Sequence, residues 1–345
     1  MMLNQYSLYL ACIFIGCSLN ANAAICKSVK QLPYGHFDRG GYIEGEGDYC
    51  LTYDIYQPKP SKLIWESVSN FSGTLLRSEI FYDDELCHKC LQPTSVKSMS
   101  SINLEGHLLK GAPENTVGVG MSANTTLKNG FIKVPYIGVL LEFGFEVVGD
   151  FPFVSDLNGP GKVKRVIRII SEDEPATALI NHPNFYIADP TVPLFRYKNT
   201  RINIQKLNIQ AGYRGIVLGG GNNTIRNSTI EVDAHTAIYM YGPNPIIENN
   251  TIIIHGKGDT NPNFKNDGIK ILDGAIKLRD AKGGIIRNNR IIYKGGFLGF
   301  GKAPVAINLL DSKDVLIENN TIEGFKALVR QNGDTTFIDK KNAIK

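Results

Sequence analysis

Aromatic and cationic side chains recur at matching places in the C-terminal half of the sequence. Each of Tyr239, Lys277 and Asn308 is the third residue of a four-residue phrase that begins Ala-Ile and ends in Leu or Met. Tyr241 and Arg279 follow two residues after the first two of these. Lys, Arg and Tyr side chains can remove a proton from a carbon or neutralise an adjacent acid group. These five residues are therefore candidates for chemistry if the fold brings them together.

Other titratable residues lie near these phrases. His235 precedes the Tyr239 phrase and is a further candidate base, while Asp273 precedes the Lys277 phrase and is a candidate for substrate contact. Hydrolysis by paired carboxyl groups would instead need two of them on opposite sides of the bond to be cleaved. The carboxylates available for such a pair are Asp233, Asp267, Asp273 and Asp311. The cations and tyrosines fit proton abstraction better than these carboxylates fit hydrolysis.

A repeat accounts for the regular spacing. The pattern Ile-x-Asn-x-x-Ile occurs with its asparagine at 227, 249, 288 and 319, and a related phrase carries Asn129. Apolar residues that alternate with polar ones, rich in Ile, Val and Thr, indicate β-strands. Strands that recur at a period of about 20 to 50 residues are typical of a solenoid, in which each strand pairs with the equivalent strand one coil away. We therefore expect an all-β chain of stacked parallel coils.

These phrases resemble the right-handed parallel β-helix of the pectin-lyase-like superfamily. The resemblance implies a protein that acts on or binds polysaccharide, and the relatives include both lyases and hydrolases. Asn266-Asp267-Gly268 is similar only in part to the polygalacturonase motif, and no paired-aspartate motif follows it. The clustered aspartates that hold calcium in pectate lyases are not evident in the sequence. No cofactor is indicated, and calcium is the one metal left open.

The repeated asparagines have a structural interpretation. A tight turn between two strands favours a residue that tolerates left-handed backbone angles, as asparagine does. Asparagines stacked at one position can also bond to one another through their side-chain amides. We therefore interpret five of them as a structural ladder: Asn129, Asn227, Asn249, Asn288 and Asn319.

Strand geometry predicts which side chains share a surface. Side chains alternate between the two faces of a strand, so Ile and Leu of the Ala-Ile phrases point inward and the third residue points outward. One outward column would hold Val217, Tyr239, Lys277 and Asn308, and a second would hold Gly219, Tyr241, Arg279 and Asp311. Extra residues at about 256–267 and 294–302 are expected to form a wall beside these columns. A groove of this kind would suit a sugar chain.

The N-terminus indicates export. Residues 1–23 are interpreted as a signal peptide, because an apolar run is followed by Ala21-Asn22-Ala23, the small-x-small form that signal peptidase cleaves. In a second interpretation, Cys17 is the lipidated first residue of a lipoprotein. The expected location is secreted, periplasmic or on the cell surface. No later apolar run is long enough to predict a transmembrane segment.

The remaining boundaries follow from the repeat and the cysteines. Residues 24–98 are expected to form a disulfide-bonded N-terminal capping region, residues 99–339 the β-helix, and residues 340–345 a C-terminal tail. The four cysteines after the signal fit two disulfides, with Cys26–Cys50 and Cys87–Cys90 favoured among three connectivities. Alternatively, Cys87-His88-Lys89-Cys90 is a redox or zinc motif, and the solenoid is its support.

Charge and composition narrow the classes of partner. The formal net charge is +4 and no run of Lys or Arg stands out, so we expect a polysaccharide or surface glycan as partner and no nucleic acid. The first hypothesis is an exported carbohydrate-active protein, a polysaccharide lyase for an acidic glycan or a related carbohydrate-active enzyme, with Lys277 central. The alternative is a non-catalytic β-helix that serves as a glycan-binding, adhesin or scaffold protein of the cell envelope.

Overall fold

The computed structural model describes thirteen stretches of the chain. They are residues 26–31, 41–43, 47–57, 74–78, 100–112, 116–121, 123–141, 145–147, 195–197, 199–233, 235–256, 274–295 and 302–345. The predicted signal peptide, Asp273, Cys87 and Cys90 lie outside the described residues, as does most of each predicted loop insertion. All regular secondary structure within the described stretches is β-strand.

Two long sheets contain nearly all of these strands. Sheet A consists of β1 (Lys27–Ser28), β4 (Asp48–Cys50), β5 (Ile55–Gln57), β7 (Ser100–Asn103), β8 (Leu108–Gly111), β10 (Thr125–Val134), β14 (Asn203–Ala211), β16 (Thr224–Arg226), β17 (Thr229–Val232), β19 (Ile246–Glu248), β20 (Thr251–Ile254), β22 (Ile285–Arg287), β23 (Arg290–Tyr293), β25 (Val315–Glu318), β26 (Thr321–Glu323), β28 (Phe337–Lys340) and β29 (Ala343–Ile344). Sheet B consists of β2 (Lys30–Gln31), β3 (Gly41–Ile43), β6 (Thr74–Ser78), β9 (Val117–Gly120), β11 (Ile137–Leu141), β15 (Arg214–Gly219), β18 (Ile238–Tyr241), β21 (Ile276–Arg279), β24 (Ala303–Leu310) and β27 (Phe325–Asn332). A separate antiparallel pair is formed by β12 (Phe145–Val147) and β13 (Phe195–Tyr197).

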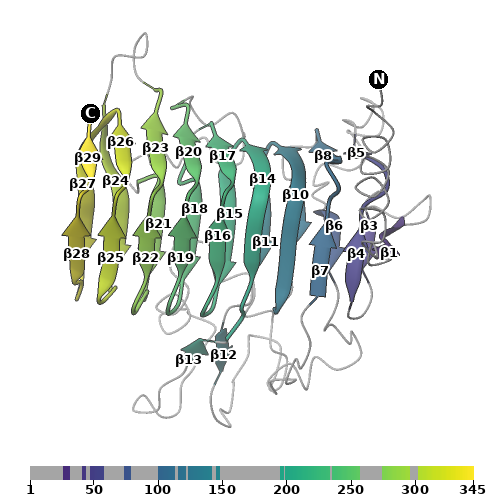
Figure 1. The fold of residues 1–345 in the computed structure, drawn as a ribbon, viewed down its shortest axis with the longest axis horizontal. Helices are drawn as coiled ribbons and strands as arrows, with labels where there is room; N and C mark the ends of the chain where they lie inside the picture. Colours follow the sequence, from purple (N-terminus) through teal and green to yellow (C-terminus); the bar gives the residue numbers. More distant parts are fainter. Residues whose placement is uncertain are drawn as a thin grey trace, which may run out of the picture.

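Successive coils stack in parallel along one axis, as Figure 1 shows. Within the repeat, β16, β19, β22, β25 and β28 pair in that order, so equivalent residues of neighbouring coils face each other. Ile225, Ile247, Ile286 and Ile317 form one such row and are all fully buried. The predicted all-β solenoid of parallel coils is confirmed.

Parallel pairing crosses the boundaries predicted at residues 99 and 339. β4 and β5 of the N-terminal region pair in parallel with β7 and β8, and β29 pairs in parallel with β26. Coils are therefore present on both sides of the repeat that the sequence reveals. The predicted Cys26–Cys50 disulfide is formed, and it joins the residue before β1 to the last residue of β4.

The apolar core runs the length of the solenoid. Inward-facing residues of both sheets make one continuous buried cluster that extends from Val29 to Phe325. Ile238 and Met240 of β18 belong to it, while Tyr239 between them does not. The predicted alternation of inward and outward side chains therefore holds in sheet B.

The asparagine pattern serves two purposes at two adjacent positions. Asn129, Asn227, Asn249, Asn288 and Asn319 have positive φ angles between 52° and 59°, as left-handed turn residues do. Of these, Asn129 donates its side-chain amide to Asn103 at 3.0 Å, whereas the other four are exposed. The buried amide ladder lies one residue later than predicted, because the side chain after the left-handed residue turns inward. It runs from Asn250 through Asn289 and Asn320 to Asn342 with N···O distances of 2.9 to 3.1 Å.

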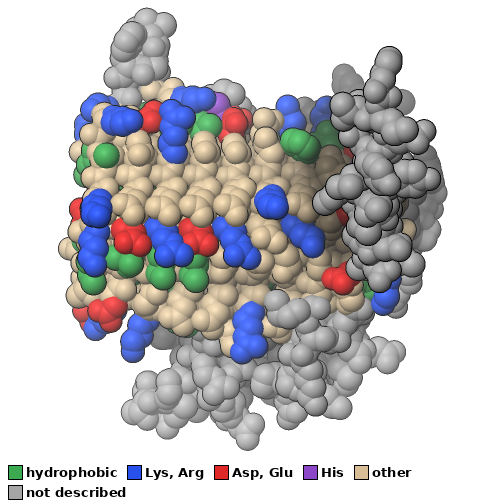
Figure 2. Space-filling model, viewed as in Figure 1, with side chains coloured by type: hydrophobic (Ala, Val, Ile, Leu, Met, Phe, Trp, Pro, Cys, Tyr) green, Lys and Arg blue, Asp and Glu red, His purple; other side chains and the backbone are tan. Residues whose placement is uncertain are grey.

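The outer face of sheet A carries charges of alternating sign. Arg226, Glu248, Arg287, Glu318 and Lys340 occupy one register position on consecutive coils. Figure 2 shows this row of alternating blue and red side chains. Arg287 donates to Glu248 through Nε at 2.8 Å and Nη2 at 2.7 Å. Side chains of opposite charge on neighbouring coils therefore lie next to one another on this exposed face.

The C-terminal coil departs from the apolar pattern on its inner side. Asp339 stands in register with the buried Ile317, and Gln331 stands in register with the buried Leu309. Both polar residues are exposed. An inward-facing polar or charged residue on an edge strand is one way in which proteins discourage pairing by another strand.

Candidate functional site

The structure places the three predicted phrase residues in one column on the outer face of sheet B. Tyr239 of β18 faces Lys277 of β21, and Lys277 faces Asn308 of β24, as Cα partners on adjacent strands. Val217 of β15 extends the column by one coil on the other side of Tyr239. Parallel register thus brings together neighbouring side chains that are 22 to 38 residues apart in sequence.

A second column lies two residues further along the same strands. Gly219, Tyr241 and Arg279 are in register there, and the next partner is Leu310. Asp311, which we expected at this position, follows the end of β24 and has a φ of 48°. A Cβ at position 219 would lie 2.3 Å from the Tyr241 ring, so a larger residue there would force this ring to move.

These columns are packed, not open to solvent. Tyr239 has an exposed fraction of 0%, and Lys277 and Arg279 have 6% each. Tyr239 and Tyr241 belong to a second buried cluster on the outer face of sheet B, together with Val117, Ile137, Tyr213 and Val217. A ligand could therefore contact only a small part of either cation in this conformation.

Cations and rings alternate along the coil axis in this cluster. The Lys277 Nζ lies 5.3 Å from the centre of the Tyr239 ring, and the Arg214 guanidinium carbon lies 5.3 Å from the same centre. Cations near the face of an aromatic ring are attracted by its quadrupole, more strongly when water is excluded. Tyr239 therefore holds two cationic side chains that come from the coils before and after it.

Arg214, Tyr213 and Tyr136 were not among the residues predicted from sequence. Arg214 is buried, and its guanidinium carbon also lies 5.1 Å from the Tyr213 ring centre. Tyr213 stacks on Tyr136 with their ring centres 5.3 Å apart, and the ring centres of Tyr213 and His235 lie 4.1 Å apart. A signal was available, because Arg214 directly precedes Gly215-Ile216-Val217-Leu218, the first copy of the repeated phrase. His235 is itself buried, so its position within the cluster is that of a packed ring.

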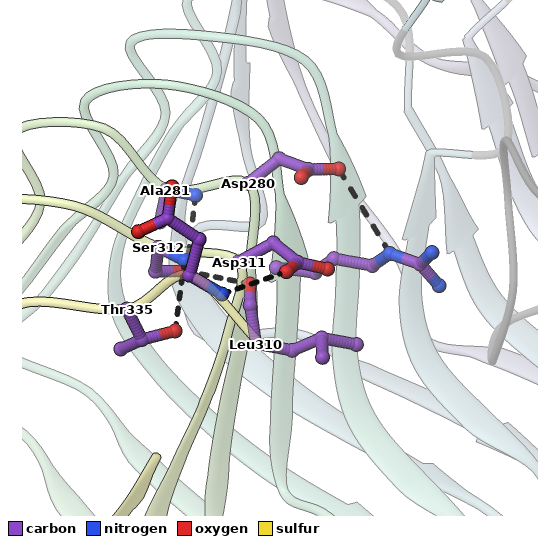
Figure 3. Close-up of polar contacts among 8 residues, drawn as sticks. Asp280, Ala281, Leu310, Asp311, Ser312 and Thr335 are labelled. Carbon is purple, nitrogen blue, oxygen red and sulfur yellow. Dashed lines mark hydrogen bonds and ion pairs between the residues drawn. The ribbon is translucent and has the colours of Figure 1, made fainter. Parts of the chain in front are cut away.

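The corner that follows these strands is drawn in Figure 3. Asp280 and Asp311 occupy equivalent left-handed positions on consecutive coils, with φ angles of 52° and 48°. Asp280 Oδ2 lies 3.8 Å from Arg279 Nε, and Asp311 Oδ1 accepts the backbone N–H of Asp334 at 3.1 Å. Ser312 fixes the turn, since its Oγ accepts the Ala281 N–H and donates to the Leu310 carbonyl. Here the two carboxylates are turn residues with defined contacts.

Asn308 offers a polar group at the end of the first column. Its side-chain oxygen Oδ1 accepts a hydrogen bond from the side-chain Nδ2 of Asn332 at 2.8 Å. The Asn308 NH₂ group is then the part that can donate to a ligand. Asn308 is buried like the cations beside it.

Metal and membrane features can be stated for the described residues. No group of three or more His, Cys, Asp or Glu side chains lies close enough there to hold a metal ion. Across the same stretches, no helix has both the length and the hydropathy that a membrane crossing would need.

The fold is that of a right-handed parallel β-helix. A family model described as "Right handed beta helix region" matches residues 194–343, which contain the asparagine repeat and the second half of sheet B. Comparison with curated proteins gives no match. The family model agrees with the paired strands, and together they establish the architecture on which the outer columns are built.

Proposed function

We propose that this is an exported carbohydrate-active protein that binds an acidic polysaccharide at the outer columns of sheet B and cleaves it by β-elimination. The observation that carries the proposal is the register of Tyr239, Lys277 and Asn308, with Arg279 one column away. An eliminating enzyme needs a base for the proton beside the carboxylate and a cation that neutralises the acid group. A lysine and an arginine two residues apart on one strand face supply both kinds of group.

Burial of the two cations affects how strongly they would attract an anion that reaches the columns. The attraction between a cation and a carboxylate grows as the effective dielectric constant falls. Lys277 and Arg279 lie beside packed tyrosines, where little water is present. A carboxylate that contacts their accessible ends would therefore be attracted more strongly than by a fully hydrated lysine, and loss of its own hydration would offset part of this gain.

The residues divide into distinct proposed roles. Lys277 is proposed as the base and Arg279 as the group that neutralises the uronate. Tyr239, which has no exposed surface, holds Lys277 in place and does not contact the glycan directly. His235 acts in the same indirect way through Tyr213. Further proposed substrate contacts are Tyr241, Asn308 and Asp273, of which Asp273 lies outside the described residues.

Absorbance near 235 nm tests the proposal, because β-elimination creates an unsaturated sugar that absorbs there. Purified protein is incubated with pectate, alginate and glycosaminoglycans, with and without calcium. Lys277→Met keeps the volume of the buried side chain but removes the amine, and loss of a general base is expected to slow the reaction about 10²- to 10⁴-fold. Lys282→Met on the same coil is the matched control, since Lys282 is exposed in the turn after Arg279. Equal rates in the two variants would contradict the role of Lys277.

A non-catalytic glycan-binding, adhesin or scaffold protein is the second candidate. The near-complete burial of Tyr239, Lys277 and Arg279 favours it, because packed side chains stabilise a sheet face whether or not a substrate visits. A flat absorbance trace with every glycan, combined with saturable binding of one of them, would support this candidate over the lyase.

A further inference from the structure

Exposed aromatic and basic side chains gather on the outer face of sheet A, near its N-terminal end. Tyr56 of β5 is 56% exposed and Phe131 of β10 is 49% exposed. The exposed lysines Lys110 of β8 and Lys133 of β10 lie beside them. Figure 2 shows green and blue side chains next to one another over β8 and β10, at the upper edge of this face. We call Tyr56, Lys110, Phe131 and Lys133 the aromatic–basic patch.

Coil stacking fixes the geometry of this patch. Tyr56, Lys110 and Lys133 occupy one register position on three consecutive coils, so they form a row along the axis at a spacing of about 4.8 Å. Phe131 lies two residues before Lys133 on the same face, in register with Leu108. The Lys110 Nζ lies 5.3 Å from the centre of the Tyr56 ring. A rigid sheet therefore presents two rings and two ammonium groups side by side.

The charge of the patch is positive. Among the described residues, neither Lys110 nor Lys133 forms an ion pair. The row continues from Lys133 to the uncharged Gln210, and its first carboxylate is Glu231, one coil further. The C-terminal part of the same face differs, because there Arg287 pairs with Glu248 and Arg290 pairs with Glu323. The cations of the patch are thus available to an external anion.

We propose that the aromatic–basic patch is a second binding site for an acidic polysaccharide, separate from the columns on sheet B. A flat ring can lie against the apolar face of a sugar, and a neighbouring ammonium group can pair with the carboxylate or sulfate that the sugar carries. A repeating polymer matches the row because the coils present their side chains at a repeating interval. The proposal shares its ligand class with the proposed function but depends on different residues.

Other partners fit this patch less well. A membrane surface would favour a larger set of protruding apolar side chains than the two rings, because anchoring depends on buried apolar area. A stable protein partner would cover about 800 Å² on each side. The row of the patch is short by comparison, because it reaches the uncharged Gln210 after three residues. An extended, charged chain needs only a narrow line of contacts, and this line is what the row supplies.

The test is a binding titration of the purified protein with size-defined oligouronates, by fluorescence or calorimetry, at low and at physiological salt. Tyr56→Ala/Phe131→Ala is expected to weaken binding about tenfold or more, which corresponds to roughly 1.4 kcal/mol. Lys110→Gln/Lys133→Gln is expected to weaken binding and to reduce its dependence on salt. The matched control is Ile338→Ala/Lys340→Ala, which removes an exposed aliphatic side chain and a lysine from the far end of the same face. All of these positions are exposed, so the variants should fold, and circular dichroism checks that they do.

The outcomes separate this proposal from the proposed function. Lys277→Met should keep the binding that depends on the patch even though it slows any reaction followed at 235 nm. A protein with no lyase activity whose binding is lost with the patch would support this inference alone. Equal affinity in the patch and control variants would overturn it, as would capture of anionic vesicles without binding of any glycan.

Discussion

The buried asparagine ladder allows a quantitative test of what holds the coils together. Asn289 sits in the middle of the ladder and makes four side-chain hydrogen bonds. Its Oδ1 accepts the backbone N–H of Asn250 at 3.0 Å and the Asn250 side-chain amide at 3.1 Å. Its Nδ2 donates to the Ile247 carbonyl at 2.9 Å and to Asn320 Oδ1 at 3.0 Å. Asn289→Ala removes all four bonds from a position that water does not reach.

The expected loss is about 4 kcal/mol of unfolding free energy, taking about 1 kcal/mol for each intramolecular hydrogen bond. Asn289→Ser should lose about half as much. Ser228 occupies the equivalent place on an earlier coil, where its Oγ accepts the Leu207 N–H at 3.2 Å. A serine at 289 can therefore still accept the Asn250 N–H, but it cannot continue the amide ladder.

Urea denaturation followed by circular dichroism measures the total loss, and native-state hydrogen exchange locates it. A deficit of about 4 kcal/mol corresponds to roughly a thousandfold faster exchange for amides that open with the ladder. The Asn250 N–H should show the largest change, because it loses its acceptor. Asn288→Gly is the control, since Asn288 is exposed with a φ of 55°, an angle that glycine adopts without strain. A loss below about 1 kcal/mol in Asn289→Ala, or one equal to that of the control, would refute the view that the ladder holds the coils together.

Two further predictions concern the N-terminal coils. Cys26→Ser removes the disulfide to Cys50, which closes a loop of 24 residues. The chain-entropy model gives a loss of about 3.5 kcal/mol of unfolding free energy. Thermal unfolding of wild type and variant without reductant measures this loss, and an unchanged melting temperature would contradict the prediction. The pKa of Asp54 is held below its usual value by the Leu108 N–H and then by His107. A lowered folded-state pKa adds stability that is present above the unfolded-state pKa and is lost as the pH falls through the folded-state value. Asp54→Asn should therefore have a lower melting temperature than wild type at pH 7, and the difference should disappear at acidic pH. The difference should be small, because Asp54 is largely exposed. A difference that does not vary with pH would contradict a stabilising role of the ionised carboxylate.

The fold and the strand register could be predicted because period-two alternation and a repeated phrase leave one arrangement of stacked strands. Tyr239, Lys277 and Asn308 are therefore in register as expected. The ladder position was displaced by one residue because two consecutive asparagines satisfy the same pattern, and only the backbone shows which one turns inward. Ser228 was a clue, since a serine can replace an asparagine in a buried hydrogen bond.

Burial of the site could not be predicted from the repeat. Stacking determines which side chains point outward, but their exposure depends on everything else that packs on that face. The sequence gives no measure of this for Lys277 or Arg279. It places Arg214 next to the first repeated phrase, but the contacts of Arg214 with the Tyr213 and Tyr239 rings are seen only in the structure. The aromatic–basic patch was missed for a related reason, because Tyr56 belongs to a coil that lies before the recognisable repeat.

The polar residues on the inner side of the C-terminal coil bear on how such a rod can change in length during evolution. An internal coil offers its neighbours the same buried isoleucines and the same amide ladder on both sides, so duplication or loss of one coil restores equivalent contacts across the junction. A coil added beyond β28 would have to bury the Asp339 carboxylate against its own core. A coil can therefore be gained or lost more easily between the internal coils than directly after β28, where Asp339 would have to be buried.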